Sequence, residues 1–360
     1  MMTKRKLFRI IKILFYSTII FNFSFLNFNC SRRFEPEPLA LSVKQNLSFL
    51  QSDAQFVMYF NFKKMRETDF WKQFISDSIF NSEKNFGSFL YTLKNATGAS
   101  ISNGIDELYF SNSWLGDNAM LIKGTFDRNK ISSYVNSDTN YSKLSYPNNI
   151  IVYTYIPAHF YFYFKDDFTV CTSNYLNQIE NTLNITDTSH AGLLKNDDAM
   201  KIIEQIRYKD NLWMMSNQKL FIRGIFENFA EMKKEGSNKI PGNRPTDTLS
   251  NVDTTSENEL SLASFYKNLN AVSFSIKMTD AIEIVMQNYC NDENSANQLK
   301  SRAEAIITLA KLSAQFSKQK STPILKLLDK VDIKNFDNIL VLNAKLEPQQ
   351  IEELRKQKIF

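Results

Sequence analysis

Hydrophobic and polar positions divide most of the chain into short segments with one of two periods. Alternating apolar positions predict strands, and apolar positions three or four residues apart predict helices. Residues 105–112 and 119–126 alternate clearly, and Leu108 and Phe110 share one face of the first segment. Turn residues lie between the two segments, so they predict a hairpin.

In the first half of the chain, the segments follow the order strand, helix, strand, strand, helix, strand. Asp127 is placed to cap the second helix. A further hairpin turned at Asp166-Asp167 comes next, and Asn174 is placed to cap the helix after it. The predicted strands are residues 56–62, 105–112, 119–126, 149–155, 160–165 and 168–173, and helical spacing runs through residues 70–93.

The second half repeats this order. Its predicted helices are residues 197–208, 218–234 and 293–317, and its predicted strands are residues 212–216, 271–278, 281–289 and 339–346. A last helix begins at Pro348, where the missing N–H of proline is tolerated. Residues 236–259 have hardly any apolar side chains, so they predict a mobile loop.

This order predicts an α+β fold of two tandem ferredoxin-like units with antiparallel sheets, and with an extra hairpin and helix between them. The first unit covers residues 47–190 and the second covers residues 191–360. The pattern leaves open whether the two units share one sheet.

The first thirty residues have a different pattern. Basic residues come first, an apolar run follows from Ile13 to Leu26, and Cys30 ends the segment. A basic head followed by an apolar stretch is typical of a secretory signal. We therefore assign residues 1–29 to a signal peptide and residues 30–46 to a tether.

The end of this signal resembles that of bacterial lipoproteins, in which Leu and two small residues precede a lipid-modified cysteine. Here Leu26-Asn27-Phe28-Asn29 precedes Cys30, which corresponds to a relaxed form of that motif. The resemblance implies lipid on Cys30 and a membrane partner, and Ser31 after the cysteine is similar to lipoproteins of the outer membrane. An uncleaved anchor and ordinary secretion are the alternatives.

The formal net charge of +5 comes from the segment that the signal would remove. The remaining chain is close to neutral, which argues against a nucleic-acid partner because such a partner requires a concentrated basic face. Besides Cys30 the chain has Cys171 and Cys290. We expect both to be buried free thiols in strands, and a disulfide between them in an oxidising compartment is the alternative.

Catalytic and metal-binding patterns are missing from the sequence. It has two histidines, His159 and His190, which do not form a zinc motif, and it has no glycine-rich phosphate loop. The carboxylate pairs Asp166-Asp167 and Asp197-Asp198 fit a turn and a helix start. We therefore expect no enzyme and no cofactor.

Aromatic residues around one predicted strand form the candidate ligand site. The alternation of residues 159–164 predicts a face of His and Tyr opposite a face of Phe. This face, extended by an earlier strand, could stack against a sugar or peptide; the alternative is half-buried tyrosines with hydrated hydroxyls. The candidate residues are Tyr153, Tyr155, His159, Tyr161 and Tyr163.

The duplicated order also resembles uncharacterised bacterial envelope proteins built from a repeated α+β unit. Residues 124–131 and the hairpin with its helix over residues 271–299 carry this resemblance. Together these observations favour a non-catalytic, lipid-anchored envelope protein that works as a binding or scaffold module with an envelope protein as partner. A small-ligand or peptide carrier and a hydrolase with a cleft between the halves are the alternatives; the oligomeric state stays open.

Overall fold

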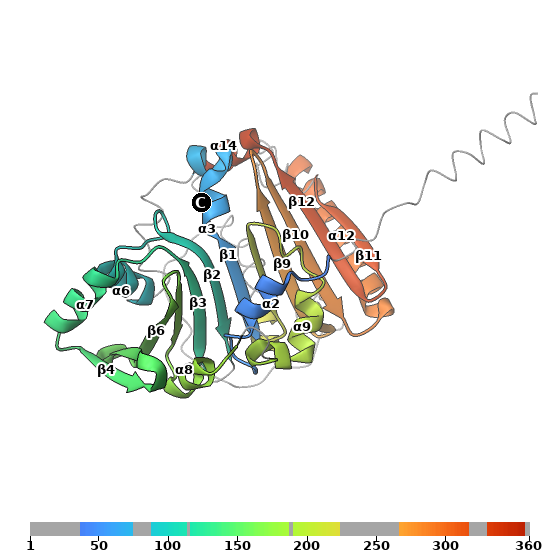
Figure 1. Ribbon diagram of the computed structural model, residues 1–360. Coiled ribbons are helices and arrows are strands. Elements are labelled where there is room, and N and C mark those ends of the chain that lie inside the picture. The colour runs from blue at the N-terminus through green and yellow to red at the C-terminus, as the bar shows by residue number, and fades with distance from the viewer. Residues whose placement is uncertain are drawn as a thin grey trace, which may run out of the picture. The chain divides into compact units, whose positions relative to one another are not determined.

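Twelve antiparallel strands of the chain form one sheet, shown in Figure 1. The computed structural model describes residues 37–74, 88–113, 116–186, 190–223, 266–316 and 330–356. The chain divides into a unit of Met1–Pro36 and a unit of Glu37–Phe360. The predicted signal peptide, Cys30 and the loop 236–259 lie outside the described residues.

The strands follow the spatial order β11-β12-β10-β9-β8-β1-β2-β3-β7-β6-β5-β4. Every pair of neighbours in this order is antiparallel. Their bounds are β1 Phe56–Asn61, β2 Ile105–Asn112, β3 Asn118–Gly124, β4 Tyr141–Tyr146, β5 Ile150–Tyr155, β6 Phe160–Asp166, β7 Thr169–Ser173, β8 Leu212–Ser216, β9 Leu269–Met278, β10 Ile282–Cys290, β11 Asp332–Phe336 and β12 Ile339–Leu346.

The two halves of this sheet have the same strand order around a central pair. Outward from β1 come β2, β3 and β7, and outward from β8 come β9, β10 and β12. The central strands β1 and β8 pair antiparallel, with Tyr59 opposite Trp213. The prediction of a mixed α+β fold with antiparallel pairing is therefore confirmed, and both halves belong to one sheet.

The tandem ferredoxin-like units are not confirmed. In a split βαβ unit another strand lies between the two strands that a helix joins, whereas here β1 and β2, which are joined through helices, pair directly with each other. In addition, β1 lies between β2 and β8, so its neighbours are the next strand along the chain and a strand of the other half. Periodicity predicted the elements in order, but it carries no information about which strands pair.

The sequence analysis missed β4 and β11, the two edge strands of the sheet. Residues of β4 are mostly exposed, and no residue of β11 is fully buried. Edge strands are commonly polar because an apolar edge would pair with other chains. They therefore lack the apolar alternation by which strands are recognised.

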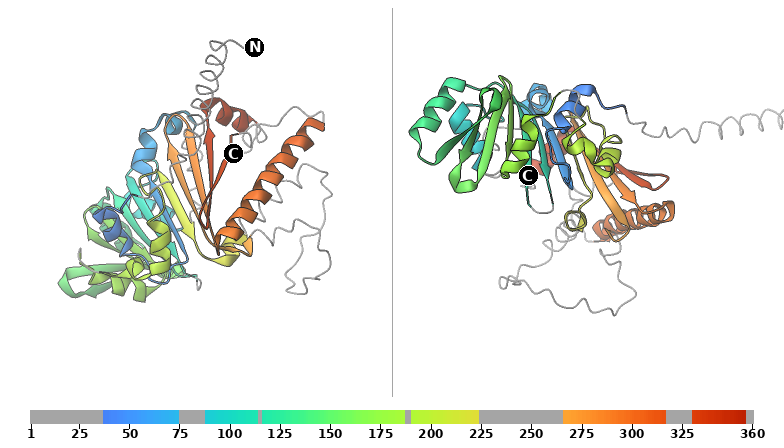
Figure 2. Two further views of the ribbon diagram at one scale, coloured as in Figure 1. Left: turned by 90° about the vertical axis from the view of Figure 1, so that its right-hand side faces the viewer. Right: turned by 60° about the horizontal axis from the view of Figure 1, so that its bottom comes forward.

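Helices cover both faces of the sheet (Figures 1 and 2). One face packs against α2 (Leu41–Leu47), α8 (Leu176–Leu183), the short 3₁₀ turn η4 (Gly192–Lys195) and α9 (Asp197–Ile203). The other face packs against α3 (Phe62–Glu67), α6 (Ser88–Thr97) and α7 (Arg128–Ser137) in the first half, and against α12 (Glu293–Phe316) in the second half. The remaining helical segments are α4 (Asp69–Phe74), η2 (Pro147–Asn149), η3 (Ile156–Ala158) and α14 (Pro348–Lys356).

Several local predictions can be checked directly. Asp127 caps α7 by accepting a hydrogen bond from the amide of Lys130, as predicted. Asn174 does not cap α8; its side chain instead accepts a hydrogen bond from the amide of Asn118 at 2.7 Å. The predicted tether of residues 30–46 overlaps α2, which begins at Leu41 and in which Leu47 is buried. In the described part of the chain, no helix is long and apolar enough to cross a bilayer.

The paired backbone at the two ends of the central strands is also duplicated. Beyond the end of β1, the amide of Asn61 donates to the carbonyl of Asn211 at 2.7 Å, just before β8. Beyond the end of β8, the amide of Asn217 donates to the carbonyl of Gln55 at 3.1 Å, just before β1. The pairing of the halves is thus continued by one hydrogen bond at each end.

Candidate functional site

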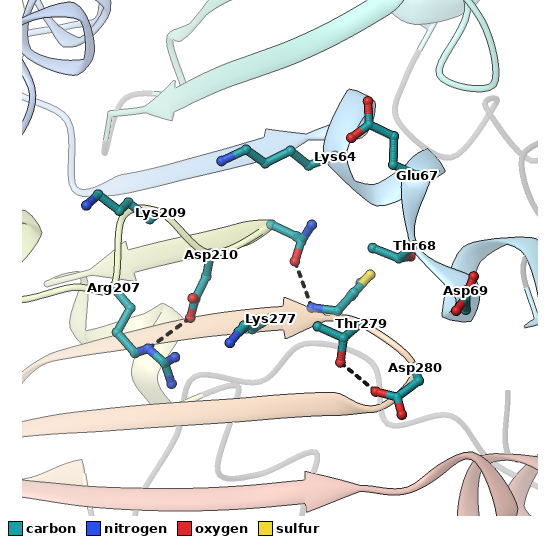
Figure 3. A pocket seen from close by; sticks show the side chains of 12 residues that line it. Lys64, Glu67, Thr68, Asp69, Arg207, Lys209, Asp210, Lys277, Thr279 and Asp280 are labelled. Carbon is teal, nitrogen blue, oxygen red and sulfur yellow. Dashed lines mark hydrogen bonds and ion pairs between the residues drawn. The ribbon is translucent and has the colours of Figure 1, made fainter.

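A hollow of about 870 Å³ lies at one end of the central strand pair. Its walls come from three segments: residues 64–69 of α3 and α4, residues 207–211 before β8, and residues 277–280 at the turn between β9 and β10 (Figure 3). The first segment belongs to the first half of the sheet and the other two to the second half. The hollow therefore lies where the two halves meet.

Main-chain and amide hydrogen bonds fix these three walls to one another. The side-chain oxygen of Asn211 accepts a hydrogen bond from the amide of Met278 at 2.7 Å. The main-chain carbonyl of Asn211 accepts a hydrogen bond from the amide of Asn61. The amide of Phe70 donates to the carbonyl of Thr279 at 2.9 Å. These hydrogen bonds hold the three walls of the hollow in place.

Asp210 is the most buried charged residue of the hollow, with 7% of its surface exposed. Its carboxylate lies 3.3 Å from Nε of Arg207, and the same guanidinium lies 3.9 Å from the carboxylate of Glu283. Burial raises the pKa of Asp210, and the neighbouring Arg207 and a hydrogen bond with Ser275 oppose this rise. These contacts make Asp210 a structural partner of Arg207.

The other charged side chains of the hollow point toward solvent. Lys64, Glu67 and Lys277 are exposed. Lys209 pairs with Glu37, the first residue that the structure describes. Asp280 accepts a hydrogen bond from Thr279 at 3.0 Å, and this bond lowers the pKa of its carboxyl.

The structure divides the predicted aromatic site between the two faces of the sheet. Tyr153 and Tyr155 pack with the cluster behind the first half, and Tyr153 stacks on Phe162 with 5.1 Å between ring centroids. Tyr161 and Tyr163 pack with the cluster on the opposite face. The prediction of one shared face was wrong because residues directly opposite in paired strands share a face, and Tyr153 lies opposite Phe162, not opposite Tyr161.

Of the four tyrosines, Tyr163 is buried in the core, and the other three are half-buried against it. The hydroxyl of Tyr163 is buried and donates to Oγ1 of Thr182 at 3.0 Å, and burial raises the pKa of Tyr163. Burial also raises the pKa of Tyr153. His159 is exposed, with a left-handed backbone at φ 46°, and follows η3.

The remaining candidate residues lie where the sequence placed them. His190 is exposed. The carboxylate of Asp166 accepts a hydrogen bond from the amide of Phe168 at 2.9 Å in a turn, and Asp197-Asp198 lie in the first turn of α9.

Cys171 and Cys290 are buried and free. Over the residues that the structure describes, no three side chains of His, Cys, Asp or Glu are grouped as metal ligands would be.

Sequence reasoning did not find the hollow. Its residues come from three segments that are far apart in the chain, and none of them forms a motif. The polar residues Asp210-Asn211 directly before a strand were the one local signal, since buried polar groups need partners. The pairing of β1 with β8 brings the segments together.

No protein-family model and no curated protein matches the chain. Among solved structures, the chain is similar to crystal form IV of TP0453, with a TM-score of 0.43, 9% sequence identity, and coverage of 86% of this chain and 96% of that one. For crystal form I the TM-score is 0.42 and the identity 10%, with 87% of this chain and 96% of that one covered. These values support no inference about family or activity.

Proposed function

We propose that this chain is an exported, non-catalytic protein that is anchored to a membrane of the cell envelope through lipid on Cys30 and acts as a binding or scaffold module. The observation that carries the proposal is the order of basic head, apolar run and cysteine in residues 1–30. Ser31 favours the outer membrane. The body then lies in the periplasm or at the cell surface.

The anchor would keep the body close to the membrane. The stretch from Cys30 to Glu37 can span at most about 25 Å when fully extended. A body so tethered meets its partners at the membrane surface. An envelope protein or a small ligand held in the hollow is the partner that this position favours.

Mass spectrometry of the native N-terminus tests the anchor. A chain that begins at Cys30 and carries acyl groups is expected, and Cys30→Ala should release the protein from the membrane fraction. Globomycin should cause the precursor to accumulate. A native chain that begins at Met1 with an unmodified thiol would overturn the proposal, and a shortened chain without lipid would indicate ordinary secretion.

A hydrolase is the second candidate, because the hollow lies between the halves and burial raises the pKa of Asp210. General acid–base catalysis uses a carboxyl with such a shift. However, Asp210 is paired with Arg207, and the pKa of Asp280 is lowered. Turnover of a panel of chromogenic esters and glycosides that is lost in Asp210→Asn would favour this candidate over the first.

A further inference from the structure

The charged side chains of the hollow are sorted by sign, with one exception. In Figure 3 the side chains of Lys64, Lys209, Arg207 and Lys277 lie on one side, and those of Glu67, Asp69 and Asp280 lie on the other. The exception is the carboxylate of Asp210, which lies on the positive side beside Arg207. The chain order explains this arrangement, because Lys64 precedes Glu67 in α3, and Lys277 near the end of β9 precedes Asp280 in the turn that follows. Both walls therefore change from positive to negative in the same direction.

Some of these charges are already engaged by the protein. Arg207 binds Asp210, Lys209 binds Glu37, and Asp69 lies 3.5 Å from Nζ of Lys72. Lys64 and Lys277 remain at the positive end, and Lys277 is also attracted to Asp210. Glu67 and Asp280 remain at the negative end, where Asp280 accepts a hydrogen bond from Thr279 and is attracted to Lys345.

We propose that the hollow binds a small zwitterion, with its anionic group near Lys64 and Lys277 and its ammonium group near Glu67 and Asp280. This inference rests on the proposed function as a binding protein and names the ligand class. A ligand with a single charge would meet attraction at one end and repulsion at the other. A zwitterion meets attraction at both ends.

The size of the ligand follows from the spacing of the walls. Two residues lie between Lys277 and Asp280, which limits the distance between their Cα atoms to about 10 Å. The terminal amine and carboxylate of a tripeptide are separated by a similar length. The headgroup of a phospholipid that carries phosphate and ammonium groups has the same chemistry at a shorter spacing.

Affinity is expected to be modest and sensitive to salt. Exposed ion pairs contribute about 0–1 kcal/mol each in water, so each pair changes the dissociation constant by up to about fivefold. Raising the salt concentration shortens the range of these interactions. Tight binding is not expected from exposed charges alone.

The test is calorimetric titration of the full chain, purified in an uncharged detergent from the cell fraction that contains it, at low salt. Triglycine and glycerophosphoethanolamine are the two zwitterionic probes. N-acetyltriglycine, which lacks the ammonium group, and triglycinamide, which lacks the carboxylate, are the matched probes. We expect each of these to bind about fivefold more weakly than triglycine.

Variants locate the binding. The pair Lys64→Met and Lys277→Met should weaken triglycine binding about fivefold, as the loss of the ligand carboxylate does, whereas Lys63→Met, an exposed neighbour on α3 outside the hollow, should leave it unchanged. Glu67→Gln with Asp280→Asn should act like the loss of the ammonium group, with Asp53→Asn as its control. The melting temperature of each variant shows that the protein is folded.

Saturable binding of triglycine alone indicates a peptide ligand, and binding of glycerophosphoethanolamine alone indicates a lipid headgroup; either supports the proposal. Absence of saturable binding by both probes overturns it, as does equal binding by the blocked peptides or by the Lys64/Lys277 variant. Since these titrations do not depend on lipid at Cys30, they fail or succeed separately from the mass spectrometry that tests the anchor.

Discussion

The two ends of the central strand pair have the same backbone connection and very different side chains. At one end, beside the Asn61–Asn211 hydrogen bond, charged residues surround an open hollow. At the other end, beside the Asn217–Gln55 hydrogen bond, Phe56 packs edge-on against Phe221 with 4.9 Å between ring centroids. The duplicated topology therefore does not create the hollow; the choice of charged or aromatic side chains does.

The aromatic end is also closed by local hydrogen bonds. The hydroxyl of Ser216 donates to the carbonyl of Gln55 at 2.9 Å and accepts from the amide of Gln218 at 3.1 Å. Buried aromatic pairs stabilise a fold beyond the area that they bury. The comparison thus suggests a division of roles, with stability at the aromatic end and binding at the charged end.

The largest expected effect is a loss of stability on replacing Gly192, which lies against the backbone of Ser48 and Leu50, upstream of β1. Gly192 has φ +52°, and a Cβ there would lie 2.0 Å from the carbonyl oxygen of Ser48. Gly192→Ala should lower the free energy of unfolding by about 3 kcal/mol, because backbone atoms must move. Urea denaturation measures this loss. Gly116→Ala is the matched control, since Gly116 has φ +86° but nothing within 4 Å of the added carbon.

Replacing one side chain at each end of the central strand pair tests the division of roles directly. Phe56 also contacts Phe110, with 6.0 Å between ring centroids, so Phe56→Ala should destabilise the fold by about 2–3 kcal/mol. Lys64→Met at the charged end should change stability by less than about 0.5 kcal/mol. Equal losses in thermal unfolding would contradict the proposed division.

Asp210 and Asp280 should give opposite pH dependences. Burial raises the pKa of Asp210 above its ordinary value of 3.8, so the folded state holds this proton more tightly than the unfolded chain. The contribution of Asp210 to stability therefore decreases as pH rises from 3.8 through the raised pKa. For Asp280, whose pKa is lowered, stability is present above 3.8 and is lost as pH falls through the lowered pKa.

These slopes are measured by urea denaturation across acidic pH, with each Asp→Asn variant compared with the unchanged protein. The unchanged protein should lose stability relative to Asp210→Asn as pH rises, and should gain it relative to Asp280→Asn. A slope of the same sign for both variants would show that the Arg207 ion pair outweighs the burial of Asp210.

The smallest expected signal is the reaction of the two buried thiols with a disulfide reagent in the folded protein. Burial raises the pKa of Cys171 to about 12 and that of Cys290 to about 11. Cys171 lies in β7 of the first half and Cys290 at the end of β10 in the second half. In a Cys30→Ala chain at neutral pH, neither thiol should react with a disulfide reagent until the sheet unfolds. Reaction of one thiol well before the other would show that the halves unfold separately.

Sequence patterns predicted the elements of the fold better than their arrangement. Strands such as β8 and β12 were found at their observed bounds, since both are rich in apolar residues next to polar turns. The pairing of β1 with β8 could not be predicted because it joins segments far apart in the chain, and alternation gives the face of a residue but not its neighbour. The aromatic platform failed for the same reason, since Tyr153 and Tyr161 alternate correctly within their own strands and lie on opposite faces of the sheet.

The ion pair between Glu37 and Lys209 joins the beginning of the described chain to the wall of the hollow. Any pull on the N-terminal segment reaches this pair first, and an exposed ion pair resists little force because water screens its charges. Further along, Leu39 and α2 are held by burial against the sheet, so they yield only under a greater load. Tension would thus release Lys209, at the positive end of the hollow, from Glu37 while the rest of the body stays folded.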